Sequence, residues 1–162
     1  MLFSSSNAMD NVILRRYDSP MDWDRPKYTL LNHTADLGIV VGGSNIESLF
    51  KTAGSAMMHI MVTSAPIKET ETIELTVSGE DYADLLVRWL GEILYLFVGE
   101  DRIVTNAHID SISPFHLKAL LETVPFDPSR HHPLREIKAV TYHQIEVREK
   151  ADGWEARIIF DL

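Results

Sequence analysis

Apolar residues recur at helical spacing in two stretches of the chain, and these stretches predict two long helices. In the first, Ser44 has Glu47 three residues on, the arrangement of a capping box, so we expect that helix to begin at Ser44. Its apolar positions form one helix face, at Ile46, Leu49, Phe50, Ala53, Met57, Ile60 and Met61. The second helix is expected over residues 80–101, with acids in its first turn and Gly99 at the position of a C-cap.

Most of the remaining chain alternates between apolar and polar residues, the period of a β-strand. The predicted strands cover residues 27–33, 37–43, 69–78, 103–112, 115–123, 137–149 and 154–162, with a hairpin turn at Asp152-Gly153. This order predicts an α+β fold, in which two long helices cover one face of a mainly antiparallel sheet.

The first part of the chain differs in composition from the rest. Residues 1–26 are polar and rich in serine, with two prolines, so we expect a flexible N-terminal extension there. Residues 27–162 then form one domain, which is long enough for a sizeable core.

Composition narrows the classes of function. The chain has no cysteine, which excludes disulfides, thiolate zinc sites and thiol catalysis, and favours the cytoplasm over secretion. No apolar run reaches the length of a membrane span. The net charge is −9, and Lys and Arg form no cluster, so the pattern favours binding of a cation or a basic protein surface over direct binding of nucleic acid.

A polar group of residues precedes the strand at 37–43. His33 and Asp36 are spaced as H-x-x-D in the segment "NHTAD". Such a short motif has two interpretations, a turn in which Asp36 accepts main-chain N–H bonds, or a metal or acid–base site. The residues alone leave both open.

The end of the chain has a second unusual feature. Asp161 follows the apolar run "RIIF" and stands beside the terminal carboxylate of Leu162. Carboxylates that lie close together repel each other, and a cation between them removes the repulsion. His131-His132 lies in the segment "FDPSRHHPLRE", which we expect to be an exposed loop.

Three segments together resemble the archease family. They are "YTLLNHTADLGIVVGGSNIESLFKTAGSAMMHIM", the helix "LLVRWLGEILYLF", and the ending "IKAVTYHQIEV…DGWEARIIFDL". The resemblance runs from Tyr28 to Leu162. It implies a small α+β accessory protein, not itself a ligase, which assists an RtcB-type RNA ligase in tRNA splicing or RNA repair. In that role it promotes the guanylylated histidine intermediate of the ligase and allows multiple turnovers.

The resemblance also implies a metal site at the two aspartates and at main-chain oxygen of the C-terminus. The matching positions here are Asp36, Asp161 and Leu162, with Lys138 contributing at the same end. His33 is then expected to be a supporting residue that hydrogen-bonds a ligand, or a weaker candidate ligand itself. Asn32 replaces the acid that many relatives carry before the HTAD segment.

These donors are all oxygens, which suits Ca²⁺ first, with Mg²⁺ and Mn²⁺ as further candidates. The expected partner is the RtcB-type ligase, with RNA contacted only indirectly. Two alternatives come from different classes of function. One is an autonomous metal-dependent phosphoesterase with His33 as its base, and the other is a chaperone or adaptor whose cation is structural. The sequence leaves the oligomeric state open.

Overall fold

The computed structural model describes residues 23–31, 35–67 and 69–162, which contain two helices and eight strands. The helices are α1 (Ile46–Met61) and α2 (Tyr82–Glu100). The strands are β1 (Tyr28–Leu31), β2 (Asp36–Gly43), β3 (Glu71–Ser78), β4 (Arg102–Ser113), β5 (His116–Pro125), β6 (Ala139–Val140), β7 (Glu146–Lys150) and β8 (Gly153–Asp161). Neither helix of the described region is long and apolar enough to cross a membrane.

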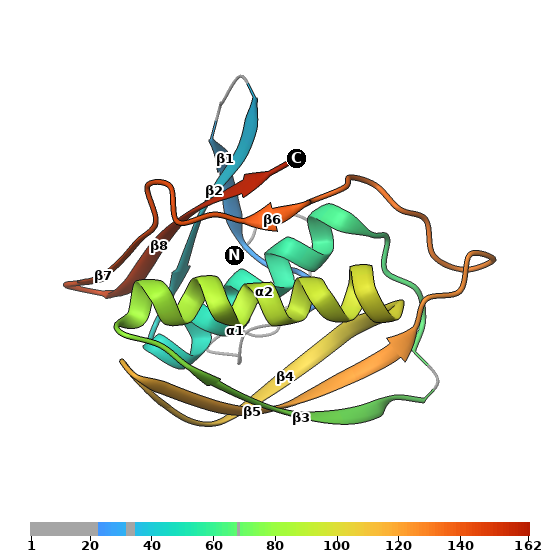
Figure 1. Ribbon diagram of the computed structural model, residues 1–162, viewed down its shortest axis with the longest axis horizontal. Coiled ribbons are helices and arrows are strands. Elements are labelled where there is room, and N and C mark those ends of the chain that lie inside the picture. Colours follow the sequence, from blue (N-terminus) through green and yellow to red (C-terminus); the bar gives the residue numbers. More distant parts are fainter. Residues whose placement is uncertain (1–22, 32–34, 68) are drawn as a thin grey trace.

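The strands form two antiparallel sheets, and the helices lie between them (Figure 1). One sheet has the order β1-β2-β8-β6, with β7 also paired to β8, and the other has the order β3-β5-β4. The α+β class and the antiparallel pairing are therefore confirmed. The prediction of one sheet was wrong in detail, because the strands divide into two sheets and each helix contacts both of them.

The composition of α1 explains why two sheets are needed. Its middle is buried on all sides, at Thr52, Ala53, Gly54, Ser55, Ala56, Met57 and Met58. A helix that is buried all round must be covered on every side, and α1 contacts β2 and β8 of one sheet and β4 of the other. The small side chains let neighbours approach closely, and the Trp89 indole N–H of α2 donates to the main-chain oxygen of Phe50 over 2.9 Å.

Two predicted helix ends were wrong by one or two residues. The N-cap of α1 is Asn45, not Ser44: the Asn45 side chain accepts from the N–H of Ser48 at 2.8 Å, and the Ser48 hydroxyl accepts from the Asn45 N–H at 3.1 Å. The helix α2 continues through Gly99 to Glu100, and its C-cap is Asp101, whose φ of 54° gives the left-handed conformation.

The predicted strand at residues 137–149 is broken into β6 and β7. Both segments pair with β8, but from Val140 to Glu146 the chain advances six positions while β8 advances three, from Phe160 to Arg157. The extra residues form a turn in which Gln144 has a φ of 55°. Residue alternation cannot reveal such a turn, because its residues keep an ordinary strand-like pattern.

Trp23 is the first residue that the structure describes, and it packs into the core. Its ring is buried, and its main-chain oxygen accepts a hydrogen bond from the Ser55 hydroxyl of α1. A Cβ on Gly54 would lie 3.1 Å from the Trp23 ring, so the small residues of α1 make room for this contact. The boundary at residue 26 stays a prediction, and residues 1–22 lie outside the described part of the chain.

Candidate metal and partner-binding site

Asp36 and Asp161, which lie at opposite ends of the folded chain, are brought directly opposite each other. Asp36 is the first residue of β2, Asp161 is the last residue of β8, and the two are register partners in the antiparallel pair. Opposed residues in such a pair point to the same face of the sheet, with Cβ atoms about 5 Å apart. The carboxylate pair expected from the sequence is therefore possible in the geometry of the sheet.

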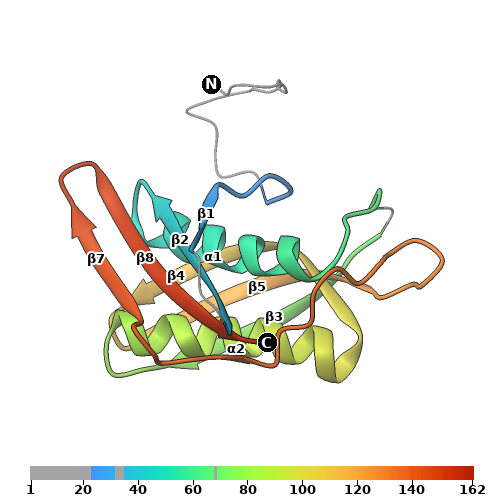
Figure 2. The same cartoon turned by 90° about the horizontal axis from the view of Figure 1, so that it is seen from above.

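The two aspartates point away from the helices. Their neighbours in the ladder, Leu37 and Phe160, form the next register pair and are buried in the core. Side chains alternate between faces along a strand, so Asp36 and Asp161 occupy the outer face. Asp161 is exposed and Asp36 is half-buried. The C-terminus lies at the tip of this sheet (Figure 2).

The strand β6 completes this end of the sheet and places Lys138 there. Ala139 is the register partner of Asp161, and the main-chain N–H of Lys138 donates to the Asp161 main-chain oxygen over 2.8 Å. Thr141 donates to the Ile159 oxygen through both its N–H (3.1 Å) and its hydroxyl (2.9 Å). Lys138, which directly precedes β6, and the two aspartates of β2 and β8 thus lie at the same end of three neighbouring strands.

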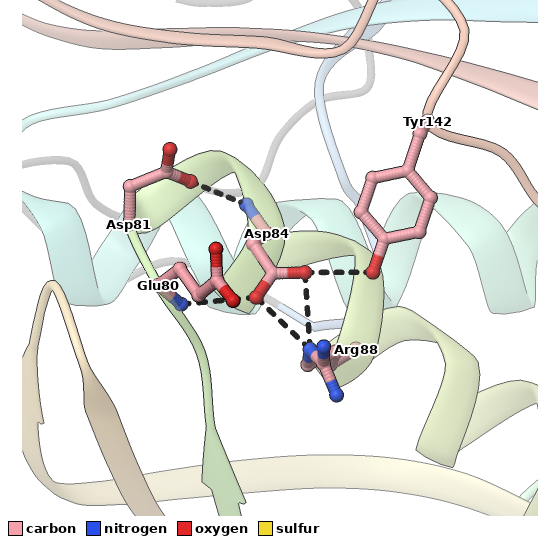
Figure 3. Close-up of polar contacts among 5 residues, drawn as sticks. All are labelled: Glu80, Asp81, Asp84, Arg88 and Tyr142. Carbon is pink, nitrogen blue, oxygen red and sulfur yellow. Dashed lines mark hydrogen bonds and ion pairs between the residues drawn. The ribbon is translucent and has the colours of Figure 1, made fainter.

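The turn after β6 is anchored to the start of α2 through Asp84 (Figure 3). The Tyr142 hydroxyl donates to the Asp84 carboxylate over 2.6 Å, and Arg88 Nε donates to both carboxylate oxygens at 3.0 Å. The Glu80 N–H donates to the same carboxylate, while Asp81 caps the helix by accepting from the Asp84 N–H. The hydrogen bond from Tyr142 to Asp84 therefore restrains the chain a few residues after Lys138.

These hydrogen bonds shift the pKa of each partner. The bond from Tyr142 lowers the pKa of Asp84, with the Glu80 N–H and Arg88 acting in the same direction. The same bond raises the pKa of Tyr142, and the contact with Asp84 raises the pKa of Arg88. Asp84 therefore stays ionised and Tyr142 stays protonated around neutral pH. Neither residue stood out in the sequence, although Asp84 belongs to the acidic first turn of the second predicted helix.

The atoms that could bind a metal at the end of the sheet near Asp36 and Asp161 are oxygens, and they are few. Within the described ranges, no group of three His, Asp or Glu side chains is close enough to hold a metal ion. The carboxylates of Asp36 and Asp161 remain as candidate donors, a chemistry that suits hard cations such as Ca²⁺. The role of Leu162 as a third donor stays a prediction. Asn32 and His33 lie outside the described residues, so their predicted supporting roles stay predictions.

Fold and site together define a small α+β protein with a carboxylate pair at the end of its C-terminal strand. The model of the "Archease protein family (MTH1598/TM1083)" matches residues 28–162. The chain belongs to the archease family. The archease of Methanosarcina acetivorans is 31% identical over 140 residues, covering 84% of this chain and 96% of the relative. The archease of Pyrococcus furiosus is 31% identical over 134 residues, covering 80% and 94%.

Solved structures agree with this fold. The solution structure of Methanobacterium thermoautotrophicum protein 1598 has a TM-score of 0.64 and 28% identity, covering 83% of this chain and 98% of that protein. The crystal structure of an archease from Thermotoga maritima, described as a possible chaperone, has a TM-score of 0.56 and 20% identity, covering 82% and 94%. At that identity, the second likeness concerns the fold alone.

Proposed function

We propose that this protein is a cytoplasmic accessory factor of an RtcB-type RNA ligase and is not itself an enzyme. It promotes guanylylation of the ligase's histidine and so raises the number of ligations per ligase, in tRNA splicing or RNA repair. Membership of the archease family supports this role. The structural observation that carries it is the register pairing of Asp36 with Asp161, which gathers negative charge at an accessible sheet end.

The donors at this end fit a divalent cation. Asp36 and Asp161 would hold it, with oxygen from Leu162 as a third donor and with His33 and Asn32 as hydrogen-bonding support. Ca²⁺ suits such an oxygen set best, and Mg²⁺ and Mn²⁺ are the other candidates. When bound, the cation supplies positive charge that stabilises phosphate groups during guanylyl transfer.

The ligase would meet the protein at the same end of the sheet. Lys138 is exposed there and provides a positive charge for a phosphate or for an acidic side chain of the ligase. The contact of Tyr142 with Asp84 restrains the chain that follows Lys138, which favours a fixed presentation of this side chain. With a net charge of −9, the protein contacts RNA only through the ligase.

A ligation assay with limiting RtcB-type ligase tests the proposal. The wild-type protein should raise the amount of RNA joined per ligase, and Asp161→Asn should abolish most of this gain. The matched control is Asp152→Asn, which changes an exposed aspartate in the hairpin at the other end of β8 and should keep full activity. A wild-type protein without effect on such ligases refutes the proposal.

The same preparation separates the two alternatives. Cation-dependent hydrolysis of a phosphate ester by the purified protein alone would establish an autonomous phosphoesterase. Ligase binding that survives chelation, together with a stimulation that Asp161→Asn leaves unchanged, would establish an adaptor with a structural cation.

A further inference from the structure

A concave site lies apart from the carboxylate pair. A cavity of about 350 Å³ opens between α1, the strands β4 and β5, and the segments that follow α1 and β5. This volume falls within the range of small-molecule sites in proteins. Much of the wall is apolar, with contributions from Trp23, Met58, Val62, Ile103, Val104 and Val124. None of the residues that line it belongs to the Asp36–Asp161 site.

His131 is a buried polar residue in the wall of this cavity. The sequence predicted an exposed histidine pair, but the expectation was wrong for His131, which is only 5% exposed and lines the cavity. Its Nδ1 accepts a hydrogen bond from the main-chain N–H of Asp127 over 2.9 Å. A nitrogen that accepts carries no proton, so the neutral ring is protonated at Nε2. The described residues record no partner for that N–H.

The loop that carries His131 is firmly built. Ser129 donates to the Asp127 carboxylate through its N–H at 2.9 Å and its hydroxyl at 2.7 Å, and these bonds lower the pKa of Asp127. The loop is also tied to the segment after α1, because His132 donates from its N–H to the Thr63 hydroxyl and accepts from the Thr63 N–H. The imidazole is therefore positioned before any ligand arrives.

The acidic side chains around the cavity disfavour an anion, and its apolar walls disfavour an ion of either sign. Asp24, Glu69 and Asp127 line it, which disfavours an anion, and the only arginine among the described lining residues, Arg130, donates to the main-chain oxygen of Pro66. An ion also loses its hydration on entering an apolar cavity. A donor such as Nε2–H requires an acceptor on the ligand.

We propose that this cavity binds a small uncharged molecule with an apolar body and one hydrogen-bond acceptor, such as a carbonyl oxygen, which receives the Nε2–H of His131. The apolar walls hold the body of the molecule and the histidine sets its orientation. This site is independent of the ligase-related role, because the two share no residue.

The dye Prodan, an uncharged aminonaphthalene ketone, has this chemistry and reports binding through a blue shift of its emission. The wild-type protein should bind it saturably at one site. Ala65 lines the cavity, and Ala65→Phe should fill part of it and weaken binding on the order of tenfold. The matched control is Ala151→Phe, an exposed position in the hairpin between β7 and β8, which should leave affinity unchanged. No saturable binding by the wild type, or equal affinity of Ala65→Phe, overturns the proposal.

The role of His131 has its own test. His131→Asn keeps an oxygen that can accept from the Asp127 N–H but removes the Nε2–H donor. Prodan should then bind about fivefold more weakly, the effect of one lost hydrogen bond. Dimethylaminonaphthalene, which lacks the ketone, should bind both proteins equally. Equal losses for the two dyes, or no loss for Prodan, would remove His131 from the recognition of the acceptor.

Discussion

Because Asp36 and Asp161 are register partners in the β2–β8 pair, we predict that removing one of their charges stabilises the protein when no divalent cation is present. The Cβ atoms of such a pair lie about 5 Å apart, and two like charges at that separation repel by about 0.8 kcal/mol at the dielectric constant of water. The exposure of Asp161 keeps the repulsion near this lower limit. Asp36→Asn keeps the shape of the side chain, so we expect a gain of about 0.5–1 kcal/mol in the free energy of unfolding. For a chain of this size, that gain raises the melting temperature by about 1–4 °C.

Urea unfolding followed by circular dichroism measures this effect. In EDTA at low ionic strength, Asp36→Asn should be more stable than the wild type, and the difference should shrink near 1 M salt, where the screening length is about 3 Å. Added Ca²⁺ should stabilise the wild type more than Asp36→Asn, because the variant lacks one charged donor. Asp152→Asn serves as control and should show neither effect. A variant that is neutral or less stable in EDTA would refute the argument that the two carboxylates repel across the β2–β8 pair.

Four further changes test the fold around the sites. Tyr142→Phe removes the hydrogen bond that chiefly lowers the pKa of Asp84. A lowered carboxyl pKa stabilises the fold at pH values above the ordinary carboxyl pKa, so the variant should lose less than about 1 kcal/mol of unfolding free energy at this exposed contact. Urea unfolding across pH should show the full loss at neutral pH and a smaller loss in acid. Gly91→Ala should stabilise the protein by about 1 kcal/mol in thermal melts, because the new methyl meets nothing within 4 Å in the middle of α2. Gly153→Ala should destabilise it by at least about 1–3 kcal/mol, because φ is 143° and the new Cβ would lie 2.3 Å from a main-chain oxygen of β2; a neutral result in the same melts would contradict the close approach of the two strands. Asn45→Ala should cost about 1 kcal/mol by removing the N-cap of α1, and an unchanged urea midpoint would contradict the capping geometry.

The sequence predicted helices, strands and turns well where the residue pattern within the segment is enough to form them. The two helices and the strand before each were found from the spacing of apolar residues, and the Asp-Gly turn was found from its residue types, with Gly153 at positive φ. The cap of α1 was missed by one residue, because Ser44 and Asn45 are both good caps and only the chain path selects between them. The break between β6 and β7 was missed because it shows only in the pairing with β8, where six positions of this chain segment stand against three positions of β8.

By itself, the sequence determined the α+β class, the archease resemblance and the chemistry of the candidate metal donors, since these follow from residue types and their order along the chain. Only the tertiary structure placed Asp36 opposite Asp161, anchored Tyr142 to Asp84, and buried His131 beside a cavity. The first two features join residues from different parts of the fold, and the burial of His131 depends on the residues that pack around it. Burial and register are properties of the packed molecule, and the local alternation of apolar and polar residues does not contain them.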